Sequence, residues 1–188
     1  MKMKVINTKL QDVKIIETPV HGDHRGFFTE SYTEDKFIAA GIPNKFIQDN
    51  HSLSVEPGVI RGMHYQTNPK AQTKLVRVTS GAIYDVLVDM RKGSPTYGQW
   101  EGYILSEHNH RQLLVPKGFA HGFCTITGNV NVQYKVDELY SPENDRGIAF
   151  DDPDIGIIWP MNNPIMSEKD TKHPQLKDAD NNFVWEEK

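Results

Sequence analysis

The sequence predicts a mainly β protein, and three observations lead to this class. Two alternating apolar runs, 75–79 and 82–90, flank Ser80-Gly81, an arrangement typical of a β-hairpin with a tight turn. Further short runs follow at 102–105, 112–115, 122–126 and 130–136. Only one segment has a clear helical pattern. Short strands at this spacing indicate an all-β sandwich or barrel.

The helical segment covers 33–40, with the sequence TEDKFIAA. Thr33 belongs to the residue types that cap helix N-termini, and Gly41 to those that end helices. A second short helix is predicted after Ser167, where Ser-Glu-Lys-Asp forms a start signal. We therefore expect few and short helices.

Length and composition indicate one globular unit inside the cell. The 188 residues suit a single domain, taken here as 1–188. The net charge of -4 argues against a broad nucleic-acid surface, and no apolar run is typical of a signal peptide or a membrane span. The single cysteine, Cys124, excludes an intrachain disulfide. We expect a cytoplasmic protein that binds neither nucleic acid nor membrane.

A basic stretch without acidic residues runs from Arg61 to Tyr84. Its cations are Arg61, Lys70, Lys74 and Arg77. Arginine binds phosphate through a planar fork of donors, while lysine acts as a point charge. A solvated hairpin face would explain the same residues. As a site, the stretch is too small to follow a nucleic-acid backbone but large enough for one pyrophosphate.

Two histidines lie in glycine-containing segments. In 58–64 (GVIRGMH), His64 follows two glycines that indicate a turn, tight backbone or close approach of a ligand. In 116–121 (PKGFAH), the spacing up to His121 is similar to the second half of the cupin signature. Cupins are small β-barrels that bind ligands in their interior. These segments therefore predict an interior ligand site.

The metal-binding half of the cupin signature is incomplete. Metal cupins have Gly-x5-His-x-His followed by Glu, whereas Tyr65-Gln66 follow His64 and the next acidic residue is Asp85. Two histidines are too few for a closed metal site. We predict a metal-free cupin, a double-stranded β-helix or jelly-roll barrel, in which His64 is free for acid–base chemistry. A metal site completed by Glu101 or His110 stays open as an alternative.

Motifs along almost the whole chain match one family. In order they are 22–31 (GDHRGFFTES), 46–52 (FIQDNHS), 58–66 (GVIRGMHYQ), 71–77 (AQTKLVR), 84–100 (YDVLVDMRKGSPTYGQW), 116–123 (PKGFAHGF), Tyr134, 140–142 (YSP) and 167–170 (SEKD). With these motifs the chain resembles the dTDP-4-dehydrorhamnose 3,5-epimerases, cupin enzymes of the dTDP-L-rhamnose pathway.

The resemblance implies an isomerase that converts dTDP-4-dehydro-6-deoxy-D-glucose to dTDP-4-dehydro-L-rhamnose. A proton leaves C5 and C3, each beside the 4-keto group, and returns on the opposite face. No metal or other cofactor is implied, because the ketone stores the charge as an enolate. A homodimer is also implied, in which segment 25–30 with Phe27 and Phe28 pairs with the partner's sheet and reaches its site.

The resemblance also implies roles for single residues. His64 would be the base, oriented by Asp170, and Tyr134 the acid on the far face. Lys74 would stabilise the enolate oxygen, with Asp85 in support. The nucleotide and sugar would be held by Arg25, Glu30, Gln48, Asp49, Asn50, Arg61, Lys74, His121, Tyr140, Asp145 and Lys169, where Tyr140 stacks on the thymine.

Structural alternatives stay open at this stage. Tyr134 fits strand packing, Asp170 a solvated helix start, and Arg25 a surface pair with Asp23. Other functions also stay open: an epimerase acting at one centre only, a metal-dependent cupin such as a dioxygenase or phosphosugar isomerase, and a non-catalytic sugar-binding cupin.

Overall fold

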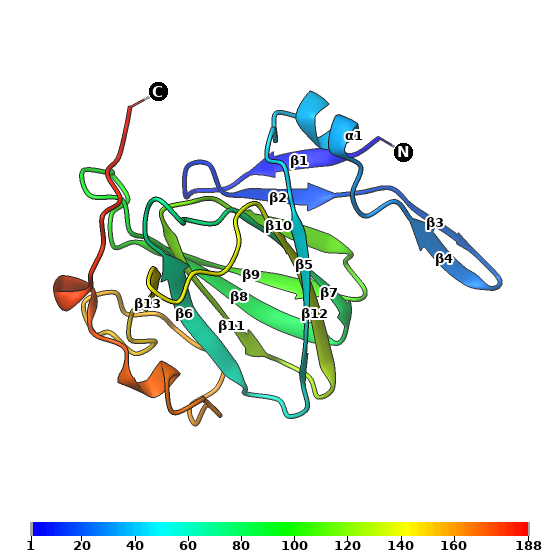
Figure 1. Ribbon diagram of the computed structural model, residues 1–188. Coiled ribbons are helices and arrows are strands. Elements are labelled where there is room, and N and C mark those ends of the chain that lie inside the picture. The colour runs from blue at the N-terminus through cyan, green and yellow to red at the C-terminus, as the bar shows by residue number, and fades with distance from the viewer. Residues whose placement is uncertain (1, 188) are drawn as a thin grey trace.

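The computed structural model describes residues 2–187, and strands dominate this part of the chain (Figure 1). The strands are β1 (Lys4–Asn7), β2 (Lys14–Glu17), β3 (Val20–Asp23), β4 (Gly26–Thr29), β5 (Gln48–Ser54), β6 (Ile60–Gln66), β7 (Lys74–Ser80), β8 (Ala82–Asp89), β9 (Trp100–Ser106), β10 (Arg111–Val115), β11 (Phe119–Thr125), β12 (Val130–Val136) and β13 (Asp145–Gly147). The helices are α1 (Glu34–Ala39) and two 3₁₀ helices, η1 (Asp170–Lys172) and η2 (Leu176–Asp178).

Two antiparallel sheets form the body of the molecule. One contains six strands in the order β1-β2-β10-β7-β12-β5, and the other contains five in the order β13-β6-β11-β8-β9. Buried side chains of both sheets pack together between them, including Val76, Val132, Leu87 and Phe123. The arrangement is a cupin-type jelly roll, so the predicted fold class is confirmed.

Each sheet is also covered on its outer face. Helix α1 lies on the six-stranded sheet, where Phe37 packs against Ile16, Leu75 and Leu114. The segment after β13 lies on the five-stranded sheet, where Ile148 and other residues pack against the outward side chains of β6, β8 and β11. Because both faces of β8 are covered, its sequence is almost continuously apolar.

Helix α1 confirms the predicted helix of 33–40 apart from its ends. Gly41 has a φ of +81°, its N–H donates to Ile38 O, and the N–H of Ile42 donates to Phe37 O. This is a Schellman ending, which requires a positive φ and favours glycine. Thr33 occupies the N-cap position, but its side chain makes no capping hydrogen bond.

The helix predicted after Ser167 is only the 3₁₀ helix η1. Ser167 does act at its start, since its hydroxyl accepts a hydrogen bond from the N–H of Asp170 at 3.1 Å. The N–H of Ala149 binds Pro174 O just beyond this turn, which ties the chain back to the body. A proline supplies no N–H to extend a helix.

The predicted hairpin of 75–79 and 82–90 is wrong. Strands β7 and β8 exist, but β7 pairs with β10 and β12, whereas β8 pairs with β9 and β11. Gly81, with a φ of +77°, carries the chain from one sheet to the other. Alternation of apolar residues identifies a strand but not its partner, which depends on packing of distant segments.

Strands β3 and β4 form a separate hairpin that projects from the body (Figure 1). The side chains of Phe27 and Phe28 on this arm are 60% and 65% exposed.

Among the described residues, no helix is long and apolar enough to cross a membrane.

Candidate active site

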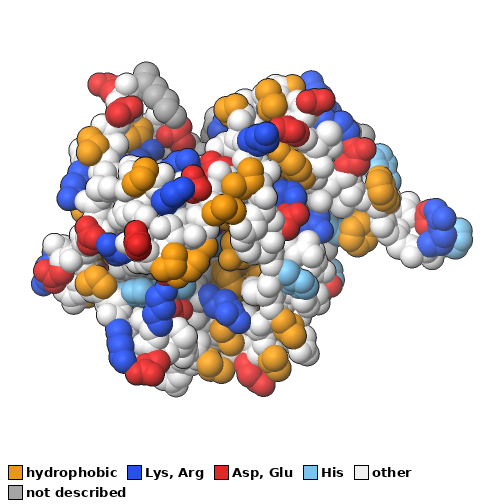
Figure 2. Space-filling model, in the orientation of Figure 1, with side chains coloured by type: hydrophobic (Ala, Val, Ile, Leu, Met, Phe, Trp, Pro, Cys, Tyr) orange, Lys and Arg blue, Asp and Glu red, His pale blue; other side chains and the backbone are white. Residues whose placement is uncertain are grey.

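A cavity of about 500 Å³ opens between the two sheets. Figure 2 shows a hollow in the middle of one face, with basic and histidine side chains around it. Its walls combine acid–base groups with apolar side chains: Ser52, Val59, Ile60, Arg61, His64, Lys74, Val76, His121, Phe123, Val132, Tyr134, Ile165, Met166, Ser167 and Asp170. This size and mixture are typical of a small-molecule site.

The acid–base groups come from opposite walls of this cavity. His64 on β6 and His121 on β11 belong to the five-stranded sheet, where they are direct cross-strand partners. Lys74 on β7 and Tyr134 on β12 belong to the six-stranded sheet. A ligand between the sheets would therefore meet His64 on one face and Tyr134 on the other.

His64 lies on a strand and not on the turn that its glycines suggested. The close approach indicated by Gly62 is real, but it involves backbone: a Cβ at Gly62, whose φ is +137°, would lie 2.5 Å from the Cα of Gly122. Only glycine fits this contact between β6 and β11. The two glycines therefore allow the histidine-bearing strands to lie close together.

His64 forms a dyad with Asp170. Its Nε2 lies 2.8 Å from Oδ1 of the carboxylate, which also accepts a hydrogen bond from the N–H of Gly62 at 3.3 Å. Burial raises the pKa of Asp170, but the hydrogen bonds and the charge of His64 outweigh it, and the pKa falls to about 2. Asp170 is thus a carboxylate at neutral pH, able to orient His64 and to stabilise its imidazolium.

A second buried dyad joins His121 and Asp85. The Nε2 of His121 lies 2.9 and 3.1 Å from the two carboxylate oxygens, and Asp85 is fully buried. Asp85 was expected to support Lys74, but its direct contact is His121. The carboxylate still acts on Lys74 through space, because its charge favours the ammonium.

Lys74 places an ammonium in the cavity wall. Burial lowers its pKa to about 8, although the charges of Asp85 and Asp145 oppose this shift. No described residue forms a direct ion pair with it. At neutral pH it is a cation available to a ligand oxygen.

Tyr134 places a phenol on the same wall. Burial raises its pKa, and the nearby charge of Arg61 acts in the opposite direction. The phenol is therefore protonated at neutral pH and can donate a proton. Arg61 is held by Ser54 Oγ and Leu53 O, each at 3.1 Å, so its guanidinium is fixed beside this phenol.

The cations of the basic stretch do not all face the cavity. Arg61 and Lys74 line the cavity, whereas Lys70 pairs with Glu138 at the surface. Arg77 lies on the opposite face of β7, beside Gln112. Because side chains alternate along a strand, a run of cations cannot all face one ligand.

A polar cluster joins three of the predicted binding residues. The hydroxyl of Tyr140 donates to Asp145 at 3.0 Å, and Lys169 forms an ion pair with the same carboxylate. The charge of Asp145 is also felt by Lys74, which places the cluster beside the cavity. The ring of Tyr140 is 60% exposed and free to stack on a ligand.

Residues of β5 are divided in the same way. The side chain of Gln48 donates a hydrogen bond to that of Asn50 at 2.8 Å. Both residues lie on the same face of β5 as Ser52, and Ser52 lines the cavity. Asp49 points to the opposite face, where it is exposed and pairs with Lys135. The cavity of this chain therefore does not include Asp49.

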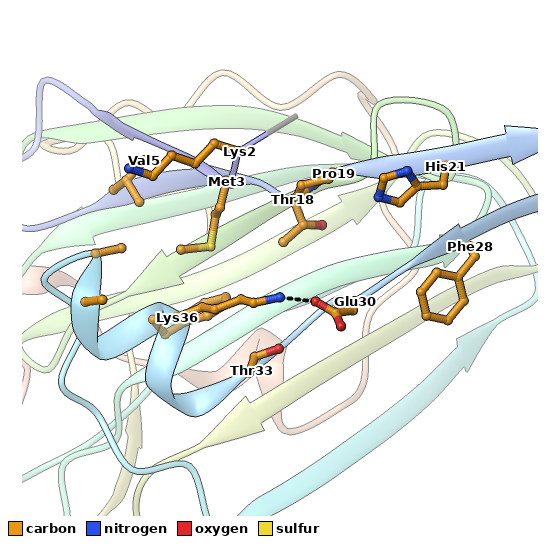
Figure 3. Close-up of a pocket in the computed structure, with 13 residues that line it drawn as sticks. Lys2, Met3, Val5, Thr18, Pro19, His21, Phe28, Glu30, Thr33 and Lys36 are labelled. Atoms are coloured by element: carbon orange, nitrogen blue, oxygen red, sulfur yellow. Dashed lines mark hydrogen bonds and ion pairs between the residues drawn. The ribbon is translucent and has the colours of Figure 1, made fainter.

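Arg25 and Glu30 also lie outside the cavity. Arg25 is on the projecting arm and pairs with Asp23. Glu30 pairs with Lys36 beside a different and larger cavity of about 790 Å³, between the arm, β1 and α1 (Figure 3). This second cavity is lined by apolar and hydroxyl groups together with Lys2, His21, Glu30 and Lys36.

The structure contradicts the alternative metal site of the sequence analysis. Glu101 accepts a hydrogen bond from the hydroxyl of Tyr103, and His110 packs on Phe27, so neither joins the two histidines. His173, which was not predicted as a site residue, packs its ring edge-on against His64. Its position three residues after Asp170, one helical turn away, was the available signal.

The fold and cavity define a cupin whose interior presents acid–base groups on two opposed walls, as an isomerase requires. Comparison with known proteins agrees, since residues 7–178 match the family described as dTDP-4-dehydrorhamnose 3,5-epimerase. The chain belongs to this family of isomerases.

Relatives cover nearly the whole chain. The dTDP-4-dehydrorhamnose 3,5-epimerase of Shigella flexneri is 49% identical over 179 residues, covering 95% of this chain and 98% of the relative. A crystal structure of the Bacillus anthracis enzyme with TDP and PPi bound has a TM-score of 0.90 and 57% identity, covering 92% and 99% of the two chains.

A Legionella pneumophila dTDP-6-deoxy-D-glucose-3,5-epimerase, solved in complex with dTDP-4-keto-L-rhamnose, is also similar. Its TM-score is 0.90 and its identity 44%, and the match covers 95% of both chains.

Proposed function

We propose that this enzyme inverts C3 and C5 of dTDP-4-dehydro-6-deoxy-D-glucose and forms dTDP-4-dehydro-L-rhamnose. The observation that carries the proposal is the opposition of the His64–Asp170 dyad to Tyr134 across one cavity. Inversion needs a base on one face of a carbon and an acid on the other. The relatives act on or bind the same class of molecule.

His64 removes the proton. When its Nε2 donates to Asp170, its Nδ1 carries the free lone pair that accepts a proton from carbon. The imidazolium that forms is stabilised by the adjacent carboxylate. Both C5 and C3 are acidic enough for this base because each lies beside the 4-keto group.

Lys74 stabilises the enolate that remains. Its ammonium lies in the cavity wall and has no direct ion-pair partner among the described residues, so it can approach the ketone oxygen as negative charge develops there. A fixed cation in a partly dry site gives strong stabilisation. No metal or redox cofactor is required for this step.

Tyr134 returns a proton on the opposite face. Donation leaves a phenolate, which the neighbouring charge of Arg61 stabilises. His64 then releases its proton and Tyr134 regains one by exchange with water, which prepares the site for the second carbon. Arg61, Lys169 and Tyr140 would hold the diphosphate and base. We also propose a cytoplasmic location, since the one cysteine, Cys124, is buried with a free thiol and the chain has no intrachain disulfide.

Incubation with dTDP-4-dehydro-6-deoxy-D-glucose in heavy water tests the reaction. NMR should show deuterium entering both C5 and C3, with the L-rhamno product appearing. Deuterium and inversion at one carbon only would instead identify a single-centre epimerase. If deuterium enters neither C5 nor C3, the whole proposal is contradicted.

We also propose a homodimer, built through the arm of β3 and β4. Phe27 and Phe28 are largely exposed on this arm, and Arg25 and Glu30 lie far from the cavity of their own chain. Burial in a partner would cover the apolar rings and bring these residues to the partner's site.

Light scattering should give a mass twice the 21.4 kDa of the chain. Phe28→Glu should shift the mass to that of a monomer, because a charge would be buried at the interface. Ile158→Glu is the matched control, since Ile158 is 74% exposed and its neighbours Ile157 and Trp159 pack on the five-stranded sheet and not on the arm. A parent protein that is monomeric and fully active would contradict the dimer.

Activity should fall as the pH rises through about 8, the pKa of Lys74. Deprotonation removes the cation that stabilises the enolate. Unfolding would not explain this loss. The pKa of Lys74 is about 8 in the folded chain and 10.5 ordinarily, so its contribution to the free energy of unfolding rises as the pH increases from 8 to 10.5. The check is kcat/KM against pH for the parent and for Lys74→Gln, which should be slow and lack this alkaline limb. A parent profile flat to pH of about 10 would contradict the role.

A further inference from the structure

His173 is a buried histidine that the proposed reaction does not use. Its side chain is 10% exposed, and its Nε2 is buried without a hydrogen-bond partner among the described residues. This nitrogen lies 3.8 Å from Oδ1 of Asp170. The ring also meets that of His64 edge-on, with centroids 5.4 Å apart. A buried nitrogen without a hydrogen-bond partner lowers the stability of the fold, and a ligand bound to it would remove this cost.

Space for His173 is made by a glycine. Gly147 on β13 is the cross-strand partner of His64, and a Cβ at this position would lie 2.5 Å from ring atoms of His173. The φ of Gly147 is not in the left-handed region, so the glycine is required by space and not by backbone conformation. The strand pairing of His64 thus leaves room for a second imidazole at Asp170.

We propose that His64, Asp170 and His173 form a binding site for one zinc ion, which inhibits the enzyme. One ligand atom from each residue lies within 4.8 Å of the other two. Zinc binds imidazole nitrogen and carboxylate oxygen at about 2.0–2.2 Å. His64 and Asp170, now 2.8 Å apart, must separate slightly and His173, now 3.8 Å from Asp170, must approach for an ion to lie between the three. The unpaired nitrogen of His173 becomes a ligand, and its free energy cost is removed.

The donor set selects the metal. Two imidazoles and one carboxylate suit zinc and similar transition metals, whereas magnesium and calcium prefer oxygen ligands. Three protein ligands leave a fourth position for water. The site is partly open to the cavity through His64, whose side chain is 32% exposed, so an ion can enter.

Zinc at this site opposes the proposed proton transfer. The ion takes Asp170 away from His64 and places two positive charges where an imidazolium must form. It therefore acts as an inhibitor and not as a cofactor. This consequence rests on the proposed function of His64, whereas binding of the ion does not.

Calorimetry on the full chain, with any affinity tag removed and after treatment with chelator, tests the site directly. Titration with zinc sulfate should show one ion per chain. His173→Gln should weaken the affinity at least tenfold, because one ligand is lost, and His108→Gln, at an exposed histidine, should not change it. Magnesium should not bind. A parent that binds no zinc, or a His173→Gln variant that binds it equally well, overturns the site.

A measurement on the parent alone guards against misfolding of the variant. NMR of the histidine ring nitrogens should show zinc shifting the signals of His64 and His173, with those of the other histidines unchanged. Shifts confined to exposed histidines such as His108 overturn the proposal.

Activity separates the site from the function. Zinc should inhibit epimerisation, with an inhibition constant equal to the calorimetric Kd, and EDTA should restore the rate. Zinc bound at His64 and His173 without inhibition overturns the inhibitory consequence and the base role of His64. Absence of zinc binding overturns the site and leaves the proposed function standing.

Discussion

Replacement of His64 by alanine is expected to abolish both epimerisation and deuterium exchange. In the proposed mechanism this imidazole alone removes the protons of C5 and C3, whereas His121, the other dyad histidine of this wall, is expected to hold the ligand. The loss of one general base lowers the rate by about 100- to 10,000-fold. The measurement is solvent deuterium incorporation by NMR beside product formation, with dTDP binding as the check that the variant is folded.

Matched variants sharpen this test. Asp170→Asn should lower the rate as well, because the imidazole loses its orienting carboxylate and its charge partner. His108→Ala, at an exposed histidine between β9 and β10, should retain parental activity. If His64→Ala exchanges deuterium at the parental rate, the proposed mechanism must be abandoned.

Tyr134→Phe is expected to separate exchange from inversion. The ring is kept and still fills its place on β12, but the proton donor is lost. His64 can still remove a proton and return one on its own face, so deuterium should enter the sugar while inversion falls by about 100- to 10,000-fold. The measurement is the ratio of the deuterium exchange rate to the rate of product formation, which should be much higher in Tyr134→Phe than in the parent.

Tyr97→Phe is the control for loss of a phenol, since Tyr97 lies in an exposed loop outside the cavity. It should change neither rate. Inversion by Tyr134→Phe at the parental rate would show that Tyr134 only packs in the strand. Loss of exchange and inversion together would show that Tyr134 acts in the first proton transfer and not in the second.

Local pattern was sufficient for the strands β7 to β12, whereas β1 to β6 and β13 were not predicted. The run 130–136 was predicted with the same bounds as β12, because alternation of apolar residues records which side chains face the core. The helix of 33–40 was found because its end depends on a single glycine with a positive φ. The resemblance of the motifs then indicated the family and predicted four catalytic residues, His64, Lys74, Tyr134 and Asp170.

Strand partners could not be read in the same way. β7 and β8 are adjacent in sequence and carry a hairpin-like turn, yet they belong to opposite sheets. In the jelly roll the apolar side chains of both strands pack against segments many residues away, and this burial of apolar surface drives folding. This pairing decides to which sheet each strand belongs, and therefore on which wall of the cavity each candidate residue lies.

The sequence by itself determined the fold class, the family and the residue types available for proton transfer, because these depend on periodicity and on motifs within short segments. Only the tertiary structure decided which groups meet. It placed His64 and Asp170, which the resemblance had paired, 2.8 Å apart although 106 positions separate them. It gave Asp85 to His121 instead of Lys74, and it turned Asp49 and Arg77 away from the cavity. It also placed His173 against the dyad. Proton transfer and metal binding act over a few ångströms, and distances of that order between segments far apart in the chain exist only once the two sheets have packed.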